Sequence, residues 1–156
     1  MLKKFVGLMA VGMLVFSLLG ADDRAFIGTW KMNEAKSKFT NTPEGKDMTL
    51  VIVKEGDSIN QSLTGTVGGK PLSQKWSVKS GGGPVSYSEG GPPSVISAVS
   101  KVINNRTVET TTTMNGKQIS VERTEVSADD KTMTAKESGL NEKGEKYSYV
   151  AVFERQ

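Results

Sequence analysis

Residues 108–125 read VETTTTMNGKQISVERTE, which is the pattern of a β-hairpin. Two runs in which apolar and β-branched side chains alternate with polar ones flank the dipeptide Asn115-Gly116. Both residues tolerate the positive φ of a type I′ turn, so this dipeptide is a strong hairpin signal. The two-residue loop places Met114 opposite Lys117. A continuous ladder from that pair then predicts which side chains share a face.

Every second residue of each strand is expected on the inner face of this hairpin. The inward set of the ladder is Val108, Thr110, Thr112, Met114, Ile119, Val121, Arg123 and Glu125. Glu109 and Glu122 are predicted on the outer face.

Two more strands extend the hairpin toward the C-terminus. Asp129-Asp130 favours one turn, and residues 141–144, Asn-Glu-Lys-Gly, favour the next. With three-residue loops and bulges at both turns, the inward residues are Met133, Ala135, Glu137, Tyr147, Tyr149, Ala151 and Phe153. The C-terminal third is therefore predicted to be a four-stranded antiparallel meander.

The preceding part of the chain also alternates with period two. One apolar strand covers residues 48–53. The next alternates from Ile59 to Val67, and a third places Leu72, Gln74, Trp76 and Val78 on one face. The region 81–93 is rich in Gly and Pro around a short Val85-Ser86-Tyr87 segment, and its prolines place any strand there at an edge or a barrel mouth. The chain is predicted to be all-β.

Residues 1–21 differ from everything that follows. Lys3 and Lys4 precede an almost unbroken apolar run from Phe5 to Leu19, which ends in Gly20-Ala21. This is the organisation of a secretory signal peptide, cleaved after Ala21 or Gly20. The alternative, a membrane anchor, needs roughly 20 apolar residues to cross a bilayer, more than this run supplies. We therefore divide the chain into a signal peptide at 1–21 and one domain at 22–156, in a protein that is secreted or periplasmic.

Composition excludes several kinds of chemistry. The chain has 156 residues, no His and no Cys, and a net charge of +3, of which Lys3 and Lys4 supply two. Without His or Cys it has no Ser-His-Asp or Cys-His catalytic group, no disulfide and none of the usual zinc sites. The nearly neutral domain also lacks the basic surface expected of a nucleic-acid partner.

A second motif stands near the start of the domain. Residues 26–33 read FIGTWKMN and residues 35–39 read AKSKF. This stretch resembles the Gly-x-Trp opening of the calycins, the group of lipocalins and fatty-acid-binding proteins. It resembles more closely a family of exported, lipocalin-like bacterial domains that begin GTWK-x-N-x-AKSKF, and the similarity extends to residues 105–109 and 152–156.

The resemblance implies an antiparallel up-and-down barrel of 8–10 strands, with Gly28 and Trp30 as a structural plug packed against a basic residue. It also implies a small hydrophobic or amphipathic ligand. Two features of fatty-acid-binding proteins are missing. The Arg-x-Tyr that holds a carboxylate on the last strand is replaced by Ala151-Val152-Phe153, and no helical lid fits between Asn33 and Met48.

The predicted inner face brings four charged residues together, namely Arg106, Arg123, Glu125 and Glu137. One interpretation is a structural ion network at a barrel mouth. The other is an anion site in which Arg123 holds a ligand head group by a bidentate contact. The candidate ligand-binding residues are Arg123, Arg106, Glu125, Trp76, Tyr149 and Phe153. The aromatic members of this set, with Tyr87 and Tyr147, suit either a cavity lining or a filled core.

We therefore expect an exported, monomeric, lipocalin-like barrel that binds or carries a small hydrophobic or amphipathic molecule. It is expected to be non-catalytic, without cofactor or metal, and without a membrane span once the signal peptide is removed. A filled barrel acting as a structural or protein-interaction module of the cell envelope is the alternative. A third hypothesis is an enzyme of calycin shape that uses Tyr and Glu for acid–base chemistry, which requires such residues to lie buried in the interior.

Overall fold

The computed structural model describes residues 24–141 and 143–156, so the predicted signal peptide lies outside the described residues. Within them the chain is all-β, as predicted, with twelve strands and a short 3₁₀ turn before β2. The elements are β1 (Gly28–Met32), η3 (Glu34–Lys36), β2 (Lys38–Thr40), β3 (Gly45–Glu55), β4 (Ser58–Val67), β5 (Lys70–Lys79), β6 (Gly83–Pro84), β7 (Ser86–Glu89), β8 (Ile96–Asn104), β9 (Thr107–Met114), β10 (Lys117–Val126), β11 (Thr132–Leu140) and β12 (Lys146–Arg155). None of the described segments is a helix long and apolar enough to cross a membrane.

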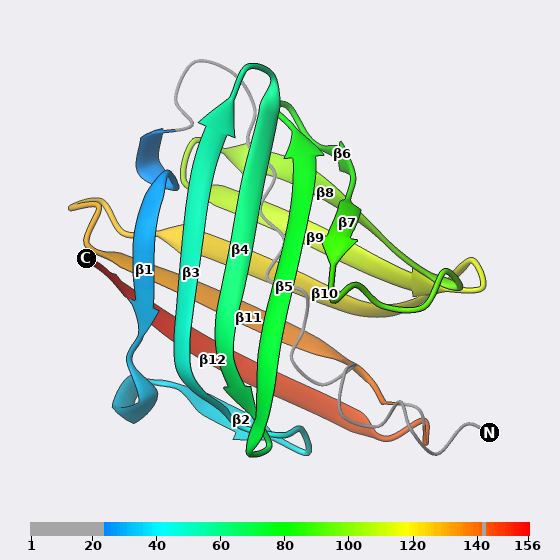
Figure 1. The fold of residues 1–156 in the computed structure, drawn as a ribbon. Coiled ribbons are helices and arrows are strands. Elements are labelled where there is room, and N and C mark those ends of the chain that lie inside the picture. The colour runs from blue at the N-terminus through cyan, green and yellow to red at the C-terminus, as the bar shows by residue number, and fades with distance from the viewer. Residues whose placement is uncertain (1–23, 142) are drawn as a thin grey trace.

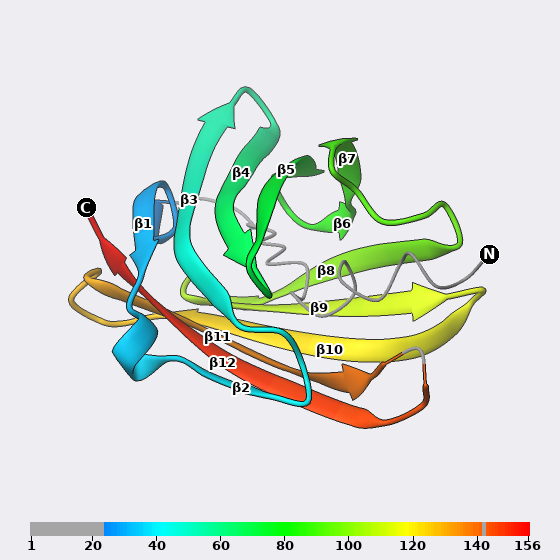
Figure 2. The same ribbon diagram turned by 60° about the horizontal axis from the view of Figure 1, so that its bottom comes forward.

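The strands form one antiparallel sheet that curls into a nearly closed barrel (Figures 1 and 2). The strand order is β6-β8-β9-β10-β11-β12-β1-β3-β4-β5-β7, and β2 pairs with β12 beside this path. The two ends of the order, β6 and β7, are consecutive in the chain, so the edges of the sheet come together there. Nine strands of five residues or more make up most of the described wall, and β2, β6 and β7 are shorter additions. The predicted up-and-down barrel is confirmed.

The meander predicted for the C-terminal third is confirmed as β9 to β12. Asn115 and Gly116 have φ angles of 51° and 78°, as the predicted turn requires, and Met114 pairs with Lys117. The strand β8 at 96–104 was not among the predicted elements. Its inward positions include the small residues Ala98 and Ser100, which weaken the contrast between its two faces.

The predicted register of β10 is wrong beyond its first two pairs. Gln118 pairs with Thr113, but Ser120 pairs with Thr112, so Ile119 is an extra residue in a β-bulge. A bulge of one residue reverses the face of every later side chain relative to an uninterrupted ladder. Glu122 therefore points inward, whereas Arg123 and Glu125 point outward. The inward sets predicted for β9, β11 and β12 are confirmed.

One end of the barrel is filled with large apolar side chains. Phe26, Trp30, Met133 and Phe153 are fully buried there. Each such side chain contributes about 1.5–3 kcal/mol relative to an exposed position. The indole Nε1 of Trp30 donates to the Phe26 carbonyl oxygen at 2.8 Å, which satisfies its polar atom inside the core. This end has the character of a packed core.

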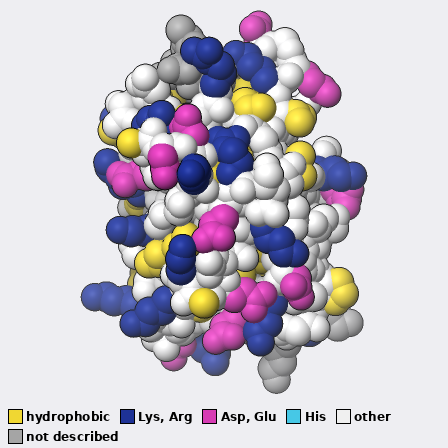
Figure 3. Space-filling view, turned by 90° about the vertical axis from the view of Figure 1, so that its left-hand side faces the viewer, with side chains coloured by type: hydrophobic (Ala, Val, Ile, Leu, Met, Phe, Trp, Pro, Cys, Tyr) yellow, Lys and Arg dark blue, Asp and Glu magenta, His cyan; other side chains and the backbone are white. Residues whose placement is uncertain are grey.

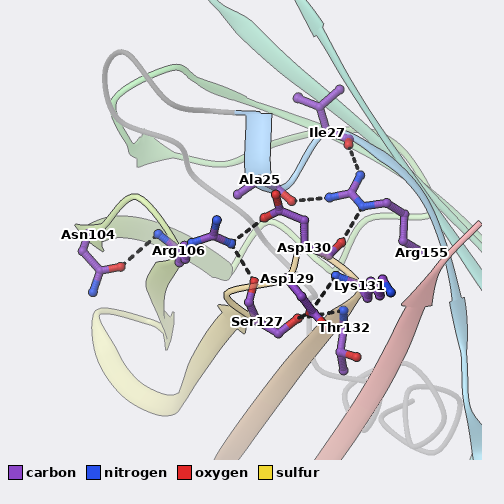
Figure 4. A network of polar contacts seen from close by, with 10 residues as sticks. All are labelled: Ala25, Ile27, Asn104, Arg106, Ser127, Asp129, Asp130, Lys131, Thr132 and Arg155. Carbon is purple, nitrogen blue, oxygen red and sulfur yellow. Dashed lines mark hydrogen bonds and ion pairs between the residues drawn. The ribbon is translucent and has the colours of Figure 1, made fainter.

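Arg155 holds the chain segment before β1 against this packed end (Figure 4). Its guanidinium lies 4.1 Å over the Trp30 ring and donates to the carbonyl oxygens of Ala25, Ile27 and Asp130 at 2.6, 2.6 and 2.7 Å. Gly28 leaves room for it, because a Cβ at this position would stand 2.6 Å from Nη1 of Arg155. Trp30 thus lies at a barrel end beneath a basic side chain.

Candidate functional site

The other half of the interior carries two carboxyl groups that face each other across neighbouring strands. Glu122 on β10 pairs directly with Glu137 on β11, and Glu137 pairs with Tyr149 on β12. The exposed fractions of these residues are 2%, 5% and 3%. The bulge at Ile119 places Glu122 in this row. We call Glu122 and Glu137 the acid pair.

Two tyrosines and a threonine bind the acid pair. The Tyr149 hydroxyl contacts Oε2 of Glu122 and lies 3.0 Å from Oε2 of Glu137. The Tyr147 hydroxyl donates to Oε1 of Glu137, and the Thr124 hydroxyl lies 3.3 Å from Oε1 of Glu122. The single hydroxyl proton of Tyr149 can be donated to only one of the two carboxyl groups. The other contact becomes a hydrogen bond when that carboxyl group is protonated and donates to the phenol oxygen.

Burial raises the pKa of Glu137, and the hydrogen bonds from Tyr147, Tyr149 and Ser120 oppose that shift only in part. Burial also raises the pKa of Tyr149 and of Tyr147, and the negative charge of the neighbouring carboxylates adds to the effect. The phenols therefore stay neutral hydrogen-bonding groups. Glu137 retains its proton at pH values at which an exposed glutamate is ionised.

A second group of polar side chains lines the opposite wall, on β5 and β7. Trp76 pairs with Tyr87 across these strands, with ring centroids 6.2 Å apart. Three buried atoms of this wall have no hydrogen-bond partner: Oε1 of Gln74, Nε1 of Trp76 and the Tyr87 hydroxyl. We call Gln74, Trp76 and Tyr87 the facing wall. Since buried polar atoms are almost always hydrogen-bonded, three exceptions on one wall require an explanation.

The facing wall and the acid pair share the same interior. Figure 2 shows β5 and β7 across the barrel from β10, β11 and β12. Burial raises the pKa of Tyr87, and the negative charges of Glu122 and Glu137 raise it further, which places the phenol within electrostatic reach of both. Polar groups from five strands thus converge on one region of the interior, an arrangement typical of small-molecule sites.

An open depression of about 700 Å³ lies on the outer side of the wall, at the end of β10, β11 and β12 nearest the acid pair. Ser120 and Tyr147 line it, and Tyr147 is also a hydrogen-bond donor to Glu137. Gly139 stands between them, since a Cβ there would lie 2.6 Å from Cβ of Ser120 and 3.0 Å from Cε1 of Tyr147. The depression therefore comes within one side chain of Glu137.

The structure separates the residues that the sequence grouped as candidate ligands. Tyr149 and Trp76 lie in the interior with Glu137, and Phe153 lies in the packed end. Arg123 and Glu125 form a 3.0 Å ion pair on the outer surface, with about half of each side chain exposed. The predicted interior position of Arg123 was therefore wrong, and the reason is the bulge at Ile119.

Arg106 lies at the packed end and not beside Glu125, the partner that the continuous ladder predicts. Its Nη1 contacts Oδ1 of Asp130 at 2.5 Å and the carbonyl oxygen of Ser127 at 2.6 Å (Figure 4). Glu125 pairs instead with Thr107. Arg106 therefore fastens the turn between β10 and β11.

Glu122 is the site residue that sequence reasoning placed on the wrong face. One signal in the sequence favours an inward position for Glu122. Val126, an apolar residue, lies four positions further along the same strand and therefore faces the same side as Glu122. Val126 is 4% exposed and belongs to the packed end.

In the described part of the chain, no group of three or more His, Cys, Asp or Glu residues is placed to hold a metal ion.

Comparison of this chain with models of protein families and with curated proteins finds no match.

Proposed function

We propose that this chain is an exported, non-catalytic barrel that binds a small amphipathic molecule in its interior. The observation that carries the proposal is the set of three unpartnered polar atoms on the facing wall, opposite the acid pair. A buried polar atom without a partner costs about 1–3 kcal/mol. A ligand whose polar group hydrogen-bonds to these atoms recovers that cost on binding.

The division of the interior supports an amphipathic ligand. Protein side chains around Trp30 and Phe153 fill the packed end, whereas the polar half combines carboxyl, phenol and amide groups with aromatic surface. Phe39 adds to this surface, with its ring centroid 5.9 Å from that of Tyr149. The polar group of the ligand belongs with the acid pair, and its apolar part belongs against Trp76, Tyr87 and Phe39.

Export and a monomeric state are parts of the same proposal. Export is supported by the basic head and the apolar run of residues 1–21. The monomeric state is supported by the one face that Figure 3 shows, where basic and acidic side chains are interspersed and apolar patches are small. The family resemblance at residues 28–39 supports the lipocalin-like character.

Native mass spectrometry of the protein purified from its own cell envelope tests the binding function. We expect an adduct of a few hundred daltons that leaves on collisional activation. Trp76→Ala removes part of the facing wall and is expected to reduce the adduct at least tenfold, whereas Arg123→Ala, on the outer surface, is the matched control. A bare polypeptide mass, together with no binding of any small amphiphile added to the protein, would favour the filled barrel.

The acid–base enzyme is a second candidate, and the Glu137–Tyr149 contact is the observation that favours it. A carboxylic acid with a raised pKa beside a phenol is suited to moving a proton on a bound molecule. The two candidates differ in the fate of the ligand. We expect the molecule recovered from the adduct to be unchanged in mass and ultraviolet spectrum after prolonged incubation with fresh protein, and a converted product would assign catalysis.

A further inference from the structure

We propose that the interior site takes a protonated amine, whose ammonium group lies between Glu137 and the facing wall. This inference rests on the proposed binding function and names the chemical class of the ligand. It reverses the charge expected from the sequence, where Arg123 was the candidate for holding an anion.

The charge of the polar half is the first argument. The hydrogen-bond donors to Glu137 are all neutral hydroxyl groups, from Tyr147, Tyr149 and Ser120, and its cross-strand neighbour is a second carboxyl group. Among the residues that the structure describes, no buried side chain is Lys or Arg. An anionic head group would add a further negative charge to two carboxyl groups, whereas an ammonium compensates the charge of one of them.

The match of hydrogen-bond donors and acceptors is the second argument. An ammonium has three N–H donors and no acceptor. The site offers it a carboxylate oxygen of Glu137, the unpartnered Oε1 of Gln74 and the oxygen of the Tyr87 hydroxyl. Nε1 of Trp76 is a donor only, so an ammonium alone leaves it without a partner, and a ligand that also carries a hydroxyl or carbonyl oxygen would satisfy it as well.

The aromatic surface is the third argument. The indole of Trp76 and the ring of Tyr87 meet at 41° on the facing wall. Faces of Trp and Tyr rings attract cations through their quadrupoles, and this attraction increases when the cation is removed from water. Acids on one wall and aromatic rings on the other form the chemical environment that recognises an ammonium group.

Binding is linked to proton release. The titratable groups that face Glu137 are Glu122 from β10, Tyr147 and Tyr149 from β12, and Tyr87 from β7. The phenols remain protonated, so the exchangeable proton belongs to the acid pair. When the ammonium enters, the protonated carboxyl group loses its proton to solvent and becomes the carboxylate that binds the cation. One proton leaves for each amine bound, and no other bond is made or broken.

Isothermal titration of the full chain with three matched compounds tests the inference. The compounds are 2-phenylethylamine, 2-phenylethanol and phenylacetate, which share a ring and a two-carbon chain and end in a cation, a neutral hydroxyl and an anion. We expect the amine to bind at least tenfold more tightly than the alcohol, and the acid to bind most weakly. Titration in two buffers of different ionisation enthalpy is expected to report proton release with the amine alone.

Two variants assign the preference to the acid pair. Glu137→Gln keeps the shape of the side chain and is expected to abolish the tenfold preference for the amine over the alcohol. Glu125→Gln neutralises an outer carboxylate and is expected to bind all three compounds as the natural chain does. If Glu137→Gln fails to fold, the natural chain still provides a test, because its amine affinity is expected to rise with pH through the titration of the acid pair.

Two results overturn the inference, and they are distinguishable. Alcohol or acid binding as tight as amine binding overturns the amine assignment and leaves the binding function in place. Absence of binding by all three compounds, together with absence of an adduct in native mass spectrometry, overturns the binding function and the amine assignment together.

Discussion

At the scale of single residues, Glu137 makes the stability of the barrel depend on pH. Its pKa is raised above 4.5 in the folded chain because burial disfavours the carboxylate. The folded state therefore binds the proton more tightly than the unfolded state does. By linkage, this contribution to stability is fully present below the unfolded pKa and is lost as the pH rises through the folded pKa.

We predict that Glu137→Gln removes this loss. The free energy of unfolding of the natural chain, measured in urea from about pH 4 to about pH 8, is expected to fall relative to that of the variant. The difference amounts to about 1.4 kcal/mol for each unit by which folding raises the pKa. Glu125→Gln, at an exposed ion pair, is the control and should follow the natural chain. Parallel curves for all three proteins would contradict the assignment of Glu137 as a buried acid.

At the scale of elements, the bulge in β10 determines which chemistry enters the barrel. An uninterrupted ladder puts Arg123 and Glu125 inside and leaves Glu122 outside. The bulged strand puts Thr124 and Val126 inside instead, where Val126 packs beside Met133. The bulged strand thus has one charged residue inside, Glu122, where the uninterrupted ladder would have two, Arg123 and Glu125. The acid pair is the result.

The absence of Cys from the chain allows this register to be tested with single cysteines. We predict that Arg123→Cys reacts rapidly with a maleimide, whereas Thr124→Cys, at a position 1% exposed, reacts only under denaturing conditions. Both variants should label fully in urea, which serves as the control for thiol reactivity. The reverse pattern of protection would restore the uninterrupted ladder and remove Glu122 from the site.

At the scale of the whole molecule, the segment before β1 completes the packed end. Phe26 is fully buried there and accepts a hydrogen bond from Trp30, and the carbonyl of Ala25 accepts one from Arg155. These contacts connect residues near position 25 with the last strand of the chain. The barrel is therefore closed at this end by both ends of the described chain.

Two truncations test this closure. A chain that begins at Arg24 keeps every one of these contacts, and we predict that it retains the β-sheet signal in circular dichroism and a cooperative thermal transition. A chain that begins at Gly28 lacks Phe26, whose burial alone contributes about 1.5–3 kcal/mol, and it is expected to melt at a markedly lower temperature. Equal melting temperatures for the two chains would show that the segment contributes nothing to stability.

The alternation of single strands predicts part of the site but not all of it. Glu137, Tyr147 and Tyr149 were placed on the inner face from the sequence, because each belongs to a regularly alternating strand. Glu122 was misplaced because one extra residue, Ile119, breaks the alternation without a Gly or Pro to mark the break. The sequence does not show that polar atoms of Gln74, Trp76 and Tyr87 lack a partner, because a hydrogen-bond partner would have to come from other strands of the barrel.

The amino-acid sequence by itself determined most of the long strands, the hairpin at Asn115-Gly116 and the absence of His and Cys chemistry. Those properties follow from backbone sterics and side-chain identity, which act over neighbouring residues. Only the tertiary structure decided that two glutamates meet under Tyr149 and face Trp76 and Tyr87 across the barrel. The face that β10 turns inward depends on the free energy of filling one interior from all the strands around it, which an uninterrupted ladder from one turn does not include.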